Sequence, residues 1–127
     1  MSSLSAGKVI YSLLASDAEL MATVTKIFPV VVDSASLPYI TYRRVALNSQ
    51  PQKAGMGADT ARVEVNVFTE EYADGVELAE RVRADLETYN SKEVAGSLLR
   101  GCYLEASEET WGDDAFVQRM VFNVRIN

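Results

Sequence analysis

The segment at residues 60–89 limits the possible folds more than any other part of the chain, because the spacing of its apolar residues changes halfway along. Its first half alternates polar residues with an apolar series formed by Ala61, Val63, Val65 and Val67. A period of two is typical of a strand with one buried face. After Glu71 the apolar residues return every three or four positions, which indicates an amphipathic helix. The segment therefore predicts a strand that leads into a helix packed on its apolar face.

The helix expected after Glu71 has an apolar stripe and a charged outer side. The stripe contains Val76, Ala79, Val82 and Leu86, with Leu78 and Tyr89 beside it. Pairs of opposite charge lie four positions apart, namely Glu77 with Arg81, Arg81 with Asp85, and Arg83 with Glu87. Each such pair contributes only about 0.2–0.5 kcal/mol to helix stability, so packing of the stripe is expected to matter more.

The composition excludes most familiar enzyme mechanisms. The chain of 127 residues contains no histidine, which removes the usual general base near neutral pH and the commonest transition-metal ligand. Catalysis would depend on lysine or carboxylates alone, and we expect no catalytic residue, metal site or cofactor. The single cysteine, Cys102, is expected to be a small buried apolar residue. The length suits one domain over residues 1–127.

The charge and hydropathy of the chain limit its partners. The net charge of -6 argues against nucleic-acid binding, which requires a basic surface to neutralise phosphates. We therefore expect no sequence-specific nucleic-acid contact. The chain has no run of about 18 or more apolar residues and no signal-peptide pattern at its start, so we expect a soluble cytoplasmic protein without membrane contact.

The remaining segments predict an α/β (α+β) fold, in which an antiparallel sheet is packed by an N-terminal helix and one long helix. A break divides the N-terminal segment into two helices, because Ser16 and Glu19 have the spacing of a capping box. Residues 27–32 predict an edge strand or an extended connection, since Pro29 has no N–H to donate. Strands at residues 39–45, 98–105 and 115–126 complete the order helix, helix, strand, strand, helix, strand, strand.

Residues 48–59 form a long loop between two strands and are a candidate partner-contacting segment. Lys53 and Met56 near its tip are the residues expected to touch a partner, although mobility in solvent is the more common fate of such a loop. Gly55 and Gly57 do not make a phosphate loop, because the strand-to-helix context and the remaining glycine and lysine spacing are absent.

Residues 106–114 are expected to form a long acidic turn around Trp111. With the preceding residue they supply the carboxylates Glu105, Glu108, Glu109, Asp113 and Asp114. Such clusters can hold Ca²⁺ or Mg²⁺, but the ligand spacing of a calcium loop is absent. Paired carboxylates could also act as in a glycosidase, but that chemistry needs a cleft. A solvated acidic turn is the favoured interpretation.

The outward-facing residues predict a subunit interface. The outer sheet face is too apolar to be left wholly wet, which is compatible both with a covering partner and with an amphipathic sheet that has stray apolar residues. The acidic helix exterior and the arginine-bearing strands have opposite charge, which suits self-association, although a mixed solvated surface is the simpler alternative. The candidate interface residues are Arg62, Glu64, Phe68, Glu77, Glu80, Glu87, Arg119 and Arg125.

Short motifs along most of the chain resemble one known family. They are KVIYSLL at residues 8–14, DAEL at 17–20, IFP at 27–29, LPYITY at 37–42, VEVNVF at 63–68, YAD at 72–74, AERVRADL at 79–86 and FVQRMVFNV at 116–124. With these motifs the chain is similar to the tail-completion and tail-terminator (head-tail joining) proteins of tailed bacteriophages and prophages. The acidic turn at residues 106–114 is longer than the family pattern, which leaves that surface undefined.

The resemblance implies an α/β domain that forms a ring, commonly of six subunits, on the end of the tail tube, with no catalytic residues. It implies the tail tube protein and head-connector proteins as partners, a place in the virion tail, and assembly in the bacterial host cytoplasm. The leading hypothesis is thus a structural protein of phage tail assembly. The alternative is a small non-catalytic module that binds a ligand or peptide on the outer sheet face, and an enzyme ranks third.

Overall fold

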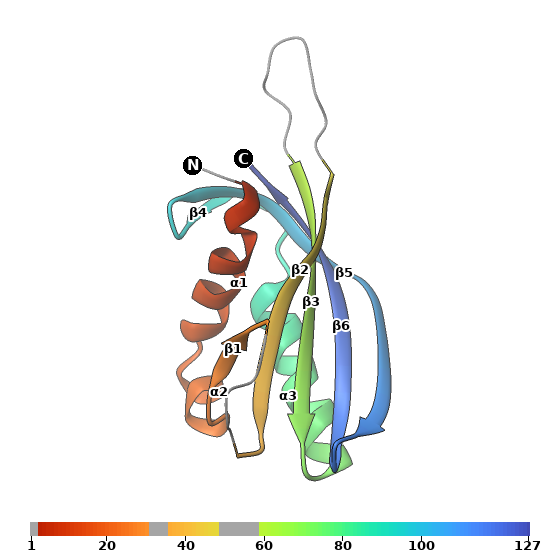
Figure 1. Cartoon of the computed structure of the whole chain (residues 1–127). Helices are drawn as coiled ribbons and strands as arrows, with labels where there is room; N and C mark the ends of the chain where they lie inside the picture. The colour runs from red at the N-terminus through yellow and green to blue at the C-terminus, as the bar shows by residue number, and fades with distance from the viewer. Residues whose placement is uncertain (1–2, 31–35, 49–58) are drawn as a thin grey trace.

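The computed structural model describes residues 3–30, 36–48 and 59–127, and the candidate contact residues Lys53 and Met56 lie outside this part of the chain. Within it the chain forms a six-stranded sheet with helices on one of its faces (Figure 1). The elements in chain order are the 3₁₀ helix η1 (Ser3–Ser5), α1 (Ala6–Ala15), α2 (Ala18–Thr23), β1 (Ile27–Pro29), β2 (Tyr39–Asn48), β3 (Asp59–Thr69), α3 (Tyr72–Leu86), β4 (Lys92–Val94), β5 (Ser97–Gly112) and β6 (Ala115–Ile126). The order differs in detail from the expected one, because β4 was not expected and the segment left open between an edge strand and a connection contains the strand β1.

The sheet is mixed. Its strand order is β1-β2-β3-β6-β5-β4, with β1 parallel to β2 and every other neighbouring pair antiparallel. The expectation of a purely antiparallel sheet is therefore wrong, because β1 and β2 run in the same direction. The edge position expected for the proline-containing segment is confirmed, since β1 is the outermost strand on its side.

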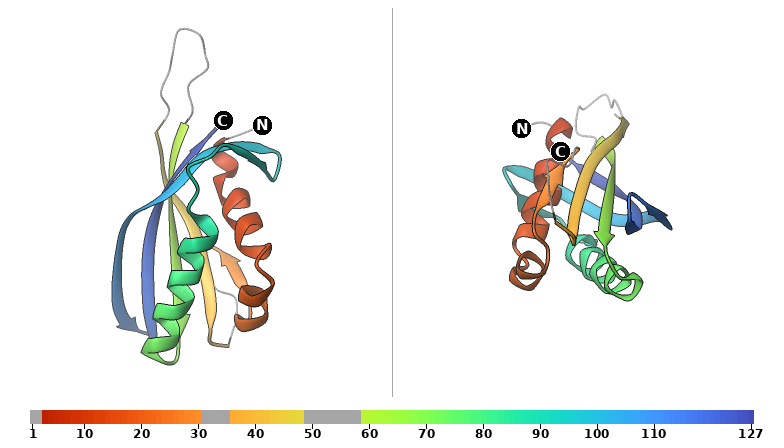
Figure 2. Two further views of the ribbon diagram at one scale, coloured as in Figure 1. Left: turned by 180° about the vertical axis from the view of Figure 1, so that it is seen from behind. Right: turned by 60° about the horizontal axis from the view of Figure 1, so that its bottom comes forward.

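The core lies between the sheet and the helices α1 and α3, which cover the same face of the sheet (Figure 2). The apolar series predicted for the central strand β3 is confirmed, because Ala61, Val63, Val65 and Val67 are fully buried. Ile10 and Leu14 of α1 and Phe122 of β6 pack in the same cluster. Cys102 is also buried there as expected, and burial raises the pKa of its thiol to about 12.

The apolar stripe of α3 is shifted from the predicted one. Its buried residues are Gly75, Leu78, Val82 and Leu86, while Val76 is 37% exposed and Tyr89, beyond the helix end, is 76% exposed. Gly75 explains the shift, because a Cβ there would lie only 2.8 Å from the Thr69 hydroxyl oxygen. The helix can approach β3 this closely only without a side chain at that position.

The break after α1 is confirmed, but its cap differs from the predicted one. Asp17, not Ser16, is the N-cap of α2, and its carboxylate accepts hydrogen bonds from the backbone N–H groups of Glu19 and Leu20 at 3.1 Å. The Ser16 hydroxyl instead donates to the carbonyl oxygen of Ser12 at 2.8 Å. An aspartate is as good a cap as a serine, and here it also meets an arginine of α3.

The long acidic turn predicted at residues 106–114 is wrong. β5 continues to Gly112, and only Asp113 and Asp114, both with positive φ, connect it to β6. Two residues with positive φ match the turn that joins twisted antiparallel strands. The segment is a strand despite its glutamates because each of them bonds to a residue of β3, β6 or α3, as described below.

Replacing Phe122 by alanine should lower the free energy of unfolding by about 3–5 kcal/mol, because it removes a fully buried ring from the centre of the core. Urea denaturation followed by circular dichroism measures this difference. The matched control is Tyr89→Ala, an exposed aromatic residue, for which a change within about 0.5 kcal/mol is expected. Equal losses for the two variants would contradict this position of the core.

Candidate assembly surfaces

The sheet face opposite α1 and α3 is not covered by any helix in the described residues, and we call it the open face (Figure 2). It is formed by alternate residues of the four long strands that the register places side by side. Its charged and apolar members include Tyr39, Arg43, Arg62, Glu64, Phe68, Val117, Arg119, Val121, Arg125, Glu105 and Glu108. The predicted interface residues Arg62, Glu64, Phe68, Arg119 and Arg125 therefore do share one face.

A row of alternating charges crosses the open face from β2 to β5. Glu64 is its centre, with a side chain only 12% exposed, and it lies 3.3 Å from Arg43 and 3.2 Å from Arg119. Arg119 continues the row to Glu108 at 3.2 Å. A carboxylate this buried needs such partners, because an unpaired charge there would be costly. These charges are thus largely satisfied within the subunit.

A second row lies next to the first and contains Glu105, the carboxylate that directly precedes the turn expected at residues 106–114. Arg62 donates two hydrogen bonds to Glu105, at 3.0 and 2.6 Å, and Asn123 donates a third at 3.1 Å. These bonds, led by that from Asn123, lower the pKa of Glu105. Among the described residues no group of three or more acidic or cysteine side chains is arranged to hold a metal ion.

Part of the apolar content of the open face is buried by its own aromatic residues. The rings of Tyr39 and Phe68 stack with centroids 4.7 Å apart, and Phe28 meets Tyr39 edge-on at 6.0 Å. Phe28 is almost fully buried, as is Val117, which the register pairs with Phe68. Part of the apolar surface inferred from the sequence is thus buried within the subunit itself.

An exposed aromatic cluster lies at the tip of the β5–β6 hairpin, and we call it the tip cluster. Trp111 is 56% exposed and Tyr72 is 46% exposed, and both meet the ring of Phe116 edge-on, at 4.8 and 5.7 Å. The Tyr72 hydroxyl donates to Glu109 at 2.9 Å, which raises the pKa of Tyr72. Exposed tryptophan and tyrosine side chains are typical anchors of protein interfaces.

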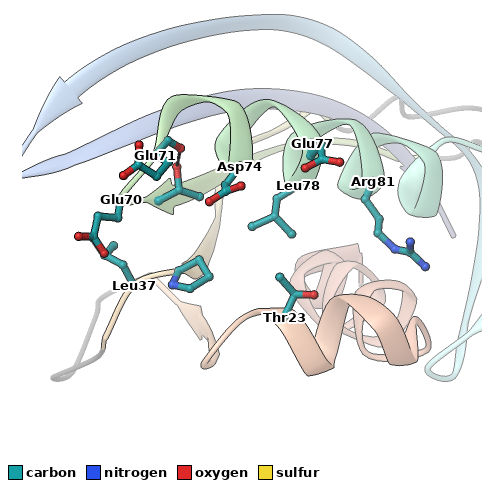
Figure 3. A pocket seen from close by; sticks show the side chains of 10 residues that line it. Thr23, Leu37, Glu70, Glu71, Asp74, Glu77, Leu78 and Arg81 are labelled. Carbon is teal, nitrogen blue, oxygen red and sulfur yellow. Dashed lines mark hydrogen bonds between the residues drawn. The ribbon is translucent and has the colours of Figure 1, made fainter.

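The first turns of α3 border an acidic pocket of about 550 Å³ (Figure 3). Its carboxylates are Glu70, Glu71, Asp74 and Glu77, and its apolar lining comes from Leu37, Pro38 and Leu78. None of these four carboxylates forms an ion pair with another described residue. This end of the molecule therefore carries uncompensated negative charge.

Two carboxyl groups, Asp17 at the start of α2 and Asp85 of α3, lie beside Arg81 where the two helices meet. Arg81 donates to both carboxylate oxygens of Asp17, at 2.6 and 2.8 Å, and to Glu19 at 2.8 Å. The predicted pairing of Arg81 with Glu77 and Asp85 is therefore wrong, since the arginine points across to α2, whereas the pair of Arg83 with Glu87 is confirmed at 3.0 Å. Helix spacing alone does not reveal a partner that tertiary packing brings closer.

Asp85 is the second carboxyl of this pair. Its Oδ2 atom is buried and has no hydrogen-bond partner when the group is ionised. Burial, followed by the hydrogen bond to Asp17, raises the pKa of Asp85 to about 7, while Arg81 holds the pKa of Asp17 far below its usual range. The pair thus holds a shared proton well above the pH at which a lone aspartate would release it.

The predicted interface residues on α3 differ in their surroundings. Glu77 and Glu80 are exposed, whereas Glu87 bonds to Arg83 and accepts the backbone N–H of Leu104 at 3.1 Å. A contact between the α3 exterior and the open face of a neighbour stays a prediction. The tip cluster and the Asp17–Asp85 pair were missed from the sequence, because their members are far apart in the chain and no local pattern connects them.

No helix in the described residues is both long and apolar enough to cross a membrane. A family model described as tail completion protein gp17 matches residues 8–127 of the chain. The fold is similar to a chain in a solved virion of a native gene transfer agent particle, with 20% sequence identity, a TM-score of 0.79 and 98% of each chain covered.

A second solved structure, whose name carries no functional description, is 15% identical with a TM-score of 0.61, and the match covers 100% of this chain and 96% of the other. A comparison with curated proteins finds no match. At these identities the two structures establish a shared fold. The family model is the finding that relates this chain to known proteins.

Replacing Asp85 by asparagine should make stability less dependent on pH. The folded-state pKa of Asp85 is raised to about 7 from an ordinary 3.8, so between these values the folded protein keeps a proton that the unfolded chain has released. The contribution of Asp85 to stability is therefore complete below the lower value and is lost as the pH rises through the upper one. D85N keeps a donor for Asp17 without a charge, and its urea midpoint should exceed that of the wild type at pH 8 by more than at pH 5.

The matched control for this comparison is Asp74→Asn, an exposed aspartate of the same helix. Its difference from the wild type should be the same at the two pH values. A D85N protein whose stability falls between pH 5 and pH 8 as steeply as that of the wild type would show that Asp85 is already ionised at pH 5.

Proposed function

The chain belongs to the family of tail completion protein gp17, and we propose that it is a structural protein of a phage tail that caps the tail tube as a ring, commonly of six subunits, and joins the tail to the head. The observation that carries this proposal is the family match, which spans almost the whole chain. Membership of a structural tail family supports a role without catalysis.

The surfaces of the subunit suit such a ring. A ring subunit needs different patches for its two neighbours and further patches for the components above and below it. The open face, the tip cluster and the acidic pocket differ in charge and apolar content, and each lies on a different part of the subunit. We therefore propose the tail tube protein and head-connector proteins as partners, a place in the virion tail, and assembly in the bacterial host cytoplasm.

The candidate interface residues remain part of the proposal, in two groups. Arg62, Glu64 and Arg119 bond to other residues of the same subunit and act mainly in shaping the open face. Glu77, Glu80 and Arg125 form no ion pair within the described residues and are available to a partner. Phe68 packs on Tyr39, and Glu87 is held by Leu104.

The alternative, a binding module that uses the outer sheet face, has one observation in its favour. A hollow of about 360 Å³ lies on the open face and is lined by residues that include Arg62, Glu64 and Arg119. Because these side chains already pair with one another or with neighbouring glutamates, a ligand would have to displace internal ion pairs. The internal pairing of these side chains therefore favours the structural role over ligand binding.

The purified chain, alone and mixed with tubes of its cognate tail tube protein, should form rings about the width of the tube at tube ends. Sedimentation velocity measures the oligomer, and negative-stain electron microscopy locates it. The matched control is the same chain with tubes already closed by bound chain, to which no more should bind. A chain that stays monomeric alone and leaves tube ends bare would refute the proposed function.

A further inference from the structure

The two lateral edges of the sheet are open over several residues. Beyond Cys102, which is bridged to Thr88, β5 is paired only on its β6 side within the described residues, and the N–H of Leu104 is held by Glu87. Every residue at 105–111 is exposed. We call this stretch the β5 edge. An exposed strand edge of this length is a template for pairing with another chain.

The opposite side of the sheet has a second open edge. β1 pairs only with residues 40–42 of β2, so within the described residues Arg43 and the residues after it have no partner on that side. β1 itself has no outer neighbour there. We call the stretch formed by Lys26, the strand β1, Arg43 and Arg44 the β1–β2 edge. Lys26, Arg43 and Arg44 are all exposed.

The register places the two edges at the same level of the sheet. Following the paired residues across it, Ile27 is level with Ile40, Val67, Gln118 and Glu109. In the same way Arg43 is level with Glu64, Val121 and Ala106, beside Glu105. Because neighbouring long strands alternate in direction, β5 runs antiparallel to β1 and β2. Copies that all point the same way around a ring axis along the strands would thus bring the two edges together antiparallel, at matching height.

The charges of the two edges are opposite. The β5 edge carries Glu105, Glu108 and Glu109 without any lysine or arginine, and the β1–β2 edge carries Lys26, Arg43 and Arg44 without any carboxylate. At matching height Glu109 would face the turn at Lys26, and Glu105 would face Arg43. Glu105, Glu108 and Arg43 already pair inside the subunit, whereas Glu109, Lys26 and Arg44 form no ion pair within the described residues and are the charges that favour the head-to-tail contact. Like charges would oppose contacts between two identical edges.

We propose that the β5 edge of one subunit binds the β1–β2 edge of a second copy of the chain, so that the sheet continues from subunit to subunit around the ring. This inference rests on the proposed function, which requires a ring. Because Pro29 has no N–H, the backbones pair only in part, and side chains carry the rest of the contact. Trp111 of the tip cluster lies on the same edge and supplies an exposed aromatic anchor.

Two charge-reversal variants test the contact. The first, Glu108→Lys with Glu109→Lys, makes the β5 edge basic, and the second, Lys26→Glu with Arg44→Glu, makes the β1–β2 edge acidic. All four residues are exposed, and the buried Glu64 with its partner Arg43 is left unchanged. Each variant alone should associate at least about tenfold more weakly than the wild type in sedimentation velocity, because like charges then face each other.

An equimolar mixture of the two variants should regain association, since every edge of one variant then meets an oppositely charged edge of the other. The comparison variant is Glu77→Lys, which tests the rival contact through the α3 exterior. Unlike Glu80, Glu77 does not line the hollow beside Ser107 of the β5 edge. If the two edges form the contact, this variant should associate like the wild type. Circular dichroism and urea midpoints establish that each variant is folded before its association is compared.

Each outcome decides the contact. Folded edge variants that associate like the wild type, a mixture that remains dissociated, or loss of association in the α3 variant alone would overturn it, and the last result would favour the helix-to-sheet contact. If the wild type still forms rings in these cases, the proposed function stands. A wild type that binds tube ends without self-association overturns the contact and the ring but keeps the tail role, whereas one that neither associates nor binds tubes refutes both.

Discussion

Burial of one side of β3 is the constraint on which the rest of the structure depends. β3 lies between β2 and β6, and its residues Ala61, Val63, Val65 and Val67 are fully shielded by the helices. Because side chains alternate along a strand, a shift of one residue in pairing would turn this apolar series outward. The burial therefore fixes the register of both neighbouring strands, and through them the level of every charged residue on the open face.

The parts of the fold that local patterns control could be predicted from the sequence. The alternation at residues 61–67, the break before α2 and the position of Pro29 at a sheet edge all follow from spacing or from the chemistry of one residue. The parts that depend on distant partners could not. The glutamates of β5 look like turn residues until Arg62, Gln118 and Arg119 are placed beside them. Arg81 likewise has two suitable partners in its own helix, yet it bonds to Asp17.

The candidate surfaces likewise have parts that the sequence predicts and parts that depend on distant partners. The sequence identifies a face with arginines and phenylalanine. It cannot reveal that Glu64 lies between two arginines from different strands, or that these charges form ion pairs within the subunit. It also cannot reveal the β5 edge, because that edge is defined by the lack of a second neighbouring strand among the described residues. Family membership and chain topology together thus say more about assembly than the composition of any single face.

The close approach of α3 to β3 at Gly75 has a geometric consequence. The Thr69 hydroxyl donates to the Glu71 carbonyl oxygen at 2.7 Å and lies 2.8 Å from where a Cβ of Gly75 would be, so the first turn of α3 packs closely on the end of the sheet. That turn carries Tyr72 on one side and Asp74 of the acidic pocket on the other. Both surfaces are therefore built on the same turn of α3, and the packing at Gly75 sets the position of that turn against the sheet.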